Sequence, residues 1–213
     1  MTSVLENPST STEFKTSMIK TLPASIVHDA IAKNSDSGNK TLQLLLQYGA
    51  SPTNAACIDI PYFDEVFRGL RTPLTTAFLF QNFAAMEILC KQDINVNHER
   101  FLDINLFHVV LNERIKICDV PFRNFCDKVS VLLIQHGADL SLGQHDFGMP
   151  LHLASAELVF EMAEAGARHD VNYVTTREVS KYWKSRFTSL RDALTLWNAS
   201  SKHADVTAAL TAF

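Results

Sequence analysis

The stretch TLQLLLQYGA, residues 41–50, joins an apolar run at helical spacing to a Gly-Ala pair. Leucines three and four residues apart lie on one side of a helix, and a glycine directly after the run can take the left-handed conformation that ends it. Two later runs close in the same way, at Gly137-Ala138 and Gly166-Ala167. The recurrence predicts helical units that stack into an extended array, because such a unit cannot bury its apolar face alone.

A second motif precedes each of these closing helices, and also the run 85–89, where Asp93-Ile94 replaces the Gly-Ala pair. It reads SIVHDA at 25–30, TPLTTA at 72–77, NLFHVV at 105–110 and MPLHLA at 149–154. The Thr72 hydroxyl can cap a helix whose first turn holds Pro73, where a missing N–H carries no cost. Leu74 and Leu151 are then expected to point into the stack, so the motif predicts the first helix of a helix-turn-helix unit.

These segments resemble the ankyrin-repeat family, whose signature is nearly reproduced at residues 149–154. The resemblance implies an all-α fold, an ankyrin-repeat solenoid of about five helix-turn-helix units with two elongated finger loops and a degenerate C-terminal cap. Residues 1–20, rich in Ser and Thr, are expected to form a flexible tail before a single domain over residues 21–213. The expected units lie near residues 21–56, 70–98, 102–143, 147–172 and 186–213.

The spacing of the units is uneven, and this unevenness locates three insertions. The third unit is roughly ten residues too long, and the fingers that follow the first and fourth units are about twice the usual length. In a solenoid, insertions map to loops and often to the binding face. The inserted loops are expected at residues 57–70, 113–124 and 173–187.

We expect the chain to bind a partner protein through its finger loops and concave face. Aromatic and charged side chains on loops of a rigid scaffold are typical of interface anchors. The expected partner-binding residues are Tyr62, Phe63, Asp64, Phe67 and Arg68 in the first long finger, His98, Arg100, Phe101, His145, Asp146 and Phe147 in the regular fingers, and Tyr182, Trp183, Lys184 and Arg186 in the second long finger.

Each long finger also has a purely structural interpretation. Phe63 and Phe67 are four residues apart, so both rings can pack on the stack from an extra helical turn. In the basic segment 173–187, Tyr182 and Trp183 can simply cover the last repeat. A third possibility for the whole chain is a structural spacer that only orients other subunits.

Composition excludes several other classes of protein. The formal net charge is −4 with a pI near 6.0, which argues against the basic surface that nucleic-acid binding requires. No apolar stretch approaches the ~18 residues of a membrane span. Four cysteines without a Cys-x-x-Cys pair, and no signal-peptide pattern, indicate reduced thiols and a cytoplasmic location. These features are also compatible with a bacterial or viral effector that acts in the cytoplasm or nucleus of a host cell.

The sequence predicts no metal site and no cofactor. His28, His108 and His152 recur at one motif position, but stacked repeats place them about 10 Å apart, too far to share a zinc ion. They are therefore expected to be structural. An enzyme with a Cys/His site is the alternative, in which one of three cysteines pairs with one of four histidines. The candidates are Cys57, Cys118 and Cys126 with His98, His136, His145 and His169.

Overall fold

The computed structural model describes residues 2–62, 65–101, 104–117 and 119–140, and five positions between residues 154 and 165. The chain divides into two compact units, residues 1–106 and 107–213. The described part is mostly helical, as the sequence predicted, and it also contains two short antiparallel hairpins. Only those five positions of the predicted units beyond residue 147 are described, and Leu151, His152 and Gly166 lie outside them.

The N-terminal segment is helical, so the prediction of a flexible tail is wrong for most of residues 1–20. Helices α1 (Thr2–Glu6) and α2 (Thr12–Thr21) form there, and α1 contacts the helix α4 described below. Leu5 and Ile19 are buried. Burial of these two apolar side chains favours packing of the segment on the rest of its unit, despite its polar composition.

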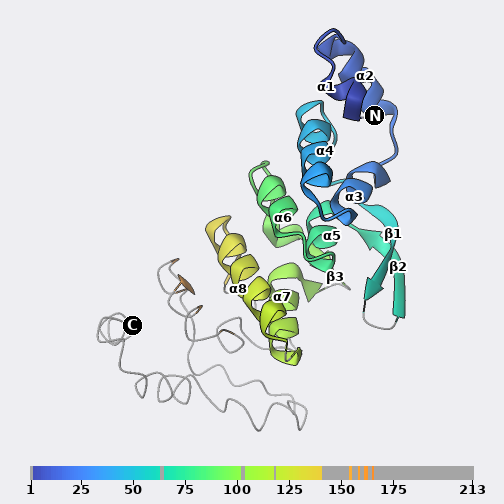
Figure 1. Ribbon diagram of the computed structural model, residues 1–213. Helices are drawn as coiled ribbons and strands as arrows, with labels where there is room; N and C mark the ends of the chain where they lie inside the picture. The colour runs from blue at the N-terminus through green and yellow to red at the C-terminus, as the bar shows by residue number, and fades with distance from the viewer. Residues whose placement is uncertain are drawn as a thin grey trace, which may run out of the picture. The chain divides into compact units, whose positions relative to one another are not determined.

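Four helices form two helical hairpins that stack on each other in the first unit (Figure 1). They are α3 (Ser25–Ala32), α4 (Asp36–Gln47), α5 (Pro73–Leu79) and α6 (Phe83–Cys90). Helix α3 packs on α4 and α5 packs on α6, while α3 also contacts α5 and α4 contacts α6. The first helices of the two hairpins, α3 and α5, are therefore neighbours, and so are the second helices, α4 and α6. Their fully buried side chains include Ile31, Leu42, Leu45, Leu74, Met86 and Leu89.

The capping predictions are confirmed at the start of α5. The Thr72 hydroxyl accepts the Thr75 N–H at 3.3 Å, and Pro73 occupies the first turn. At its other end, α5 closes on a non-glycine residue, Gln81, with φ +52°. The following Asn82 caps α6, because its Oδ1 accepts the N–H of Ala85 at 3.0 Å.

The Gly-Ala pairs at residues 49–50 and 137–138 end their helices as predicted. The φ angles are +94° at Gly49 and +82° at Gly137, in the left-handed region. Gly49 N–H donates to the Leu46 carbonyl at 3.0 Å, and Ala50 N–H donates to the Leu45 carbonyl at 2.9 Å. This is the Schellman arrangement, and the pair at Gly137 makes the equivalent two bonds.

The first long finger is a β-hairpin, so the prediction of an all-α fold is wrong at this position. Strands β1 (Ala56–Tyr62) and β2 (Glu65–Arg71) occupy almost the same residues as the predicted 57–70 loop. Phe67 lies on β2, which rules out the extra helical turn. The second finger contains a 3₁₀ turn (Val96–His98) and the short pair β3 (Arg100–Phe101) and β4 (Ile104–Asn105).

The second unit begins with two longer helices, α7 (Leu106–Lys116) and α8 (Val120–Gln135). They have 11 and 16 residues, against 7 and 8 in α5 and α6. The predicted inserted loop at 113–124 is therefore wrong as to conformation. The extra residues lengthen both helices, and only residues 117–119 lie between them.

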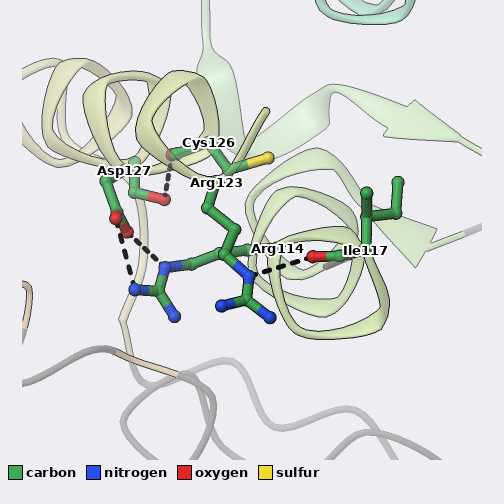
Figure 2. A network of polar contacts seen from close by, with 6 residues as sticks. Arg114, Ile117, Arg123, Cys126 and Asp127 are labelled. Carbon is green, nitrogen blue, oxygen red and sulfur yellow. Dashed lines mark hydrogen bonds and ion pairs between the residues drawn. The ribbon is translucent and has the colours of Figure 1, made fainter. Parts of the chain in front are cut away.

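A polar network ties α7 to α8 near this connection (Figure 2). The Arg114 guanidinium pairs with the Asp127 carboxylate, with Nη2 3.2 Å from Oδ2. Arg123 Nε donates to the Ile117 carbonyl at 3.0 Å. Arg114, Arg123 and Asp127, in or near the predicted insertion, therefore make bonds between α7 and α8 and to the connection between them, which gives these charged residues a structural role.

Candidate functional site

The β1–β2 hairpin is the best-defined candidate for a binding element. Its register pairs Cys57 with Leu70, Asp59 with Arg68 and Ile60 with Phe67, each as opposite residues of an antiparallel ladder. Strand β2 ends at Arg71, the next residue caps α5, and the helix starts at Pro73. The hairpin is therefore joined to a helix of the stack without a flexible linker.

The entry side of the hairpin is held by a buried histidine of α3. His28 Nε2 lies 3.2 Å from the Asn54 carbonyl, and Nδ1 lies 2.8 Å from the hydroxyl of Thr76 on α5. Burial lowers the pKa of His28, and the Asn54 bond only partly opposes this shift. Because the Asn54 carbonyl can only accept, a neutral ring that donates to it carries its proton on Nε2. Nδ1 then faces the Thr76 hydroxyl, which also bonds the Thr72 carbonyl at 2.9 Å. The structural role predicted for His28 is confirmed.

The exit side is held by an arginine. The Arg71 guanidinium carbon lies 4.7 Å from the centroid of the Phe101 ring, and its Nη1 donates to the Leu70 carbonyl at 2.8 Å. A Cβ added at Gly69 would come within 2.8 Å of Nη1 and 2.9 Å of Nη2. The guanidinium therefore contacts the backbone of its own strand and lies over the Phe101 ring on β3.

A buried acid lies beside the same junction. Glu99 is 4% exposed, and its carboxylate accepts a hydrogen bond from the Thr72 hydroxyl. Thr75 Oγ1 donates to the Arg100 carbonyl at 3.4 Å. Burial raises the pKa of Glu99, while the bonds from Thr72 and Thr75 and the nearby His98 act in the opposite direction. The segment before β3 is thus bonded to the first turn of α5.

Among the hairpin residues whose exposure the structure describes, 56–59 and 69–71, one large apolar side chain is exposed. Leu70 is 68% exposed, and its cross-strand partner Cys57 is also exposed. Asp59, two residues along β1, is exposed as well. An exposed leucine on an element that is fixed at both ends can contact a partner without ordering a loop first, which lowers the entropy cost of binding.

The predicted partner-binding residues fall into three groups. Tyr62, Phe67 and Arg68 lie on the hairpin strands, and His98 and Arg100 are exposed in the second finger. Phe101 is 8% exposed and packs under Arg71, so the expectation of an exposed ring is wrong there. Outside the described residues lie Phe63, Asp64, His145, Asp146, Phe147, Tyr182, Trp183, Lys184 and Arg186.

Sequence reasoning missed Leu70, Arg71 and Glu99. A signal for the hairpin was present, since Ile58, Ile60, Val66 and Phe67 are residue types that favour strands on both sides of a short turn. Recognising the strands would have placed Leu70 on a strand, but alternation alone does not show which face is exposed, and Leu70 is exposed while Arg71 is buried. The roles of Arg71 and Glu99 carry no such local signal, because both depend on contacts across about thirty residues of sequence.

Two buried cysteines, the candidate Cys126 and also Cys90, have thiols that are poorly suited to nucleophilic chemistry. Burial raises the pKa of Cys90 and of Cys126 to about 12, with nearby carboxylates adding to the shift. Both thiols therefore stay protonated at neutral pH, whereas the thiolate is the reactive form. Cys57, Cys90 and Cys126 are free thiols in the structure, and Cys118 lies outside the described residues.

The described residues contain no group of three or more His, Cys, Asp and Glu side chains arranged to hold a metal ion. Among the same residues, no helix combines the length and the apolar character that crossing a bilayer requires. The β1–β2 hairpin, with its exposed Leu70, is the feature to which a function can be attached. No protein-family model and no curated protein matches this sequence.

Proposed function

We propose that this chain is a protein-binding module of the ankyrin type, which holds a partner protein through its finger loops and concave face. Three features of the first unit support a repeat array. Two helical hairpins stack with like helices adjacent, TPLTTA caps the start of a first helix, and a left-handed glycine closes a second helix. A β-hairpin lies between the two helical pairs in sequence, where a finger of such an array would be.

The observation that carries the binding role is the exposed Leu70 on the anchored β1–β2 hairpin. Single apolar side chains on a surface are common and need no explanation by themselves. Leu70 differs because it lies on an inserted element, opposite the exposed Cys57 and directly before the buried Arg71. Rigid scaffolds commonly present binding residues on such elements.

The test compares two exposed apolar positions. Leu70→Ser removes the hairpin side chain, and Val120→Ser removes one of similar exposure, 61%, on α8. Affinity capture from candidate cell lysates with the full chain, followed by quantitative mass spectrometry, measures which proteins each variant retains. We expect Leu70→Ser to reduce the capture of a bound protein by about tenfold or more, as for an interface anchor, and Val120→Ser to leave it unchanged.

Thermal unfolding separates this result from a folding defect, because both substitutions replace exposed side chains and should leave stability within about 0.5 kcal/mol. Equal capture by the parent chain and by Leu70→Ser would show that Leu70 on the hairpin is not part of the binding surface. A role as a structural spacer predicts that outcome. An enzyme with a Cys/His site has weaker support, since it would depend on Cys57 or Cys118 rather than on the two buried thiols.

We further propose that the chain works in a reducing compartment such as the cytoplasm. An exposed free thiol at Cys57 is compatible with that setting, in which thiols are kept reduced. Action inside a host cell, as a bacterial or viral effector, is a proposal that rests on the divergence of the repeats from the family pattern. Mass spectrometry of thiol alkylation in intact cells would test the compartment, because a secreted form would carry oxidised cysteines.

A further inference from the structure

We infer that Arg71 locks the β1–β2 hairpin to the second finger, so that the two fingers form one rigid surface. The guanidinium lies 4.7 Å from the Phe101 ring centroid. It also lies so close to Gly69 that a Cβ there would come within 2.8 Å of Nη1 and displace it. Arg71 and Phe101 are both at least nine-tenths buried, so this stack is largely shielded from water.

The chemistry of Arg71 indicates a positioning role rather than a contribution to stability. Its Nε is buried and has no hydrogen-bond partner among the described residues. A buried donor without a partner disfavours folding, so an apolar side chain of similar length would suit a purely structural position better. A planar cation over an aromatic face, in contrast, restricts direction as well as distance.

Neighbouring contacts make the junction continuous. The Thr72 hydroxyl donates to the Glu99 carboxylate, and Thr75 Oγ1 donates to the Arg100 carbonyl, so the segment from 71 to 75 meets the segment from 99 to 101 at three points. The exposed residues Leu70 and Arg100 each adjoin a residue of the Arg71–Phe101 stack. A partner would therefore meet the two fingers at a fixed spacing, a consequence that rests on the proposed function.

Hydrogen–deuterium exchange of the full chain tests the lock directly. Arg71→Met keeps an apolar stem but removes the cation. Gly69→Ala keeps Arg71 and improves strand propensity, but its Cβ displaces the guanidinium. For both variants we expect hairpin amides to exchange about 3- to 30-fold faster, the range for a shielded cation–π contact, with α5 amides and the melting temperature unchanged.

Gly49→Ala is the matched control, because it strains the left-handed closure of α4 at a distance in sequence from the hairpin. It should lower the melting temperature without changing the ratio of hairpin to α5 exchange. The inference is overturned if Arg71→Met leaves hairpin exchange unchanged. It is equally overturned if hairpin and α5 exchange accelerate by the same factor as the protein loses stability, because Arg71 is then a core residue.

These outcomes are independent of partner binding. Hairpin exchange reports the lock whether or not a partner exists, and the comparison of Leu70→Ser with Val120→Ser reports binding without altering the stack. Suppose that Arg71→Met accelerates hairpin exchange as expected, while Leu70→Ser leaves capture unaffected. The positioning role of Arg71 is then retained, and the hairpin is rejected as the binding surface.

Discussion

Replacing Asn82 by alanine should destabilise the first unit, because this side chain connects its two helical hairpins. Asn82 is 1% exposed and uses both ends of its amide. Oδ1 accepts the Ala85 N–H at 3.0 Å, and Nδ2 donates at 3.0 Å both to the Ile31 carbonyl and to Asn39 Oδ1. The first bond caps α6, and the other two reach α3 and α4.

The magnitude follows from these bonds. Loss of the cap costs about 1 kcal/mol, and up to about 2 kcal/mol when the N–H that loses its partner is buried. The Ile31 carbonyl keeps a bond from the Asn34 N–H at 3.1 Å, so loss of the Asn82 donor there costs about 1 kcal/mol rather than a full desolvation penalty. The partly exposed bond to Asn39 adds little. The expected loss for Asn82→Ala is about 2 to 3 kcal/mol.

Urea unfolding followed by circular dichroism measures this loss as a lower midpoint at an unchanged slope. Asn82→Ser is the matched variant, since its hydroxyl can still cap α6 but cannot reach across to α3. We expect about half of the alanine effect from serine, because roughly one of the two main bonds survives. An alanine variant within about 0.5 kcal/mol of the parent chain would refute the view that Asn82 connects the hairpins.

Three further predictions concern single positions. Burial raises the pKa of Glu99 above its ordinary 4.5, so the folded state binds the proton more tightly, and the free energy of unfolding should fall as pH rises from 4.5 through the raised pKa. Glu99→Gln should flatten this pH dependence in urea unfolding, and an unaltered pH profile would contradict the prediction. Gly49→Ala should lower the free energy of unfolding by about 1 to 2 kcal/mol, whereas Gln81→Gly should raise it by about 1, since both positions are left-handed; the reverse order in thermal melts would count against these φ angles. A thiol reagent at neutral pH should modify Cys57 in the folded chain and spare Cys90, whose pKa is about 12, so equal labelling rates by mass spectrometry would disprove the burial of Cys90.

Much of the helical framework in the first unit could be predicted from the sequence because its signals are local. Thr72 caps a helix and Gly49 ends another through bonds that span only three to five residues. The burial of Leu74 follows from the motif, and Leu132 on α8 is buried as its helical spacing requires. Short-range hydrogen bonds and helical periodicity act on any chain with these residues, so they can be recognised without a neighbour.

The errors occurred where a local pattern was compatible with more than one structure. Residues 57–70 were expected to form a loop or an extra helical turn, but their strand-forming residues pair across a short turn. Residues 1–20 were expected to be a tail, although the burial of Leu5 and Ile19 supports two helices. The insertion at 113–124 extended α7 and α8 instead of forming a loop. Strand pairing at 57–70 and the burial of Leu5 and Ile19 at 1–20 are contacts with other parts of the chain, which a local pattern does not reveal.

The sequence by itself determined where α5 begins and where α4 and α8 end, and that an insertion separates the first two helical pairs. Only the tertiary structure decided what the insertion presents and how it is held. Arg71 meets Phe101, and Thr72 meets Glu99, across about thirty residues of sequence. Such contacts depend on the path of the chain between them, and no local propensity encodes that path. For the same reason the sequence could nominate a finger for binding, while the choice of Leu70 as its exposed side chain required the register of the hairpin.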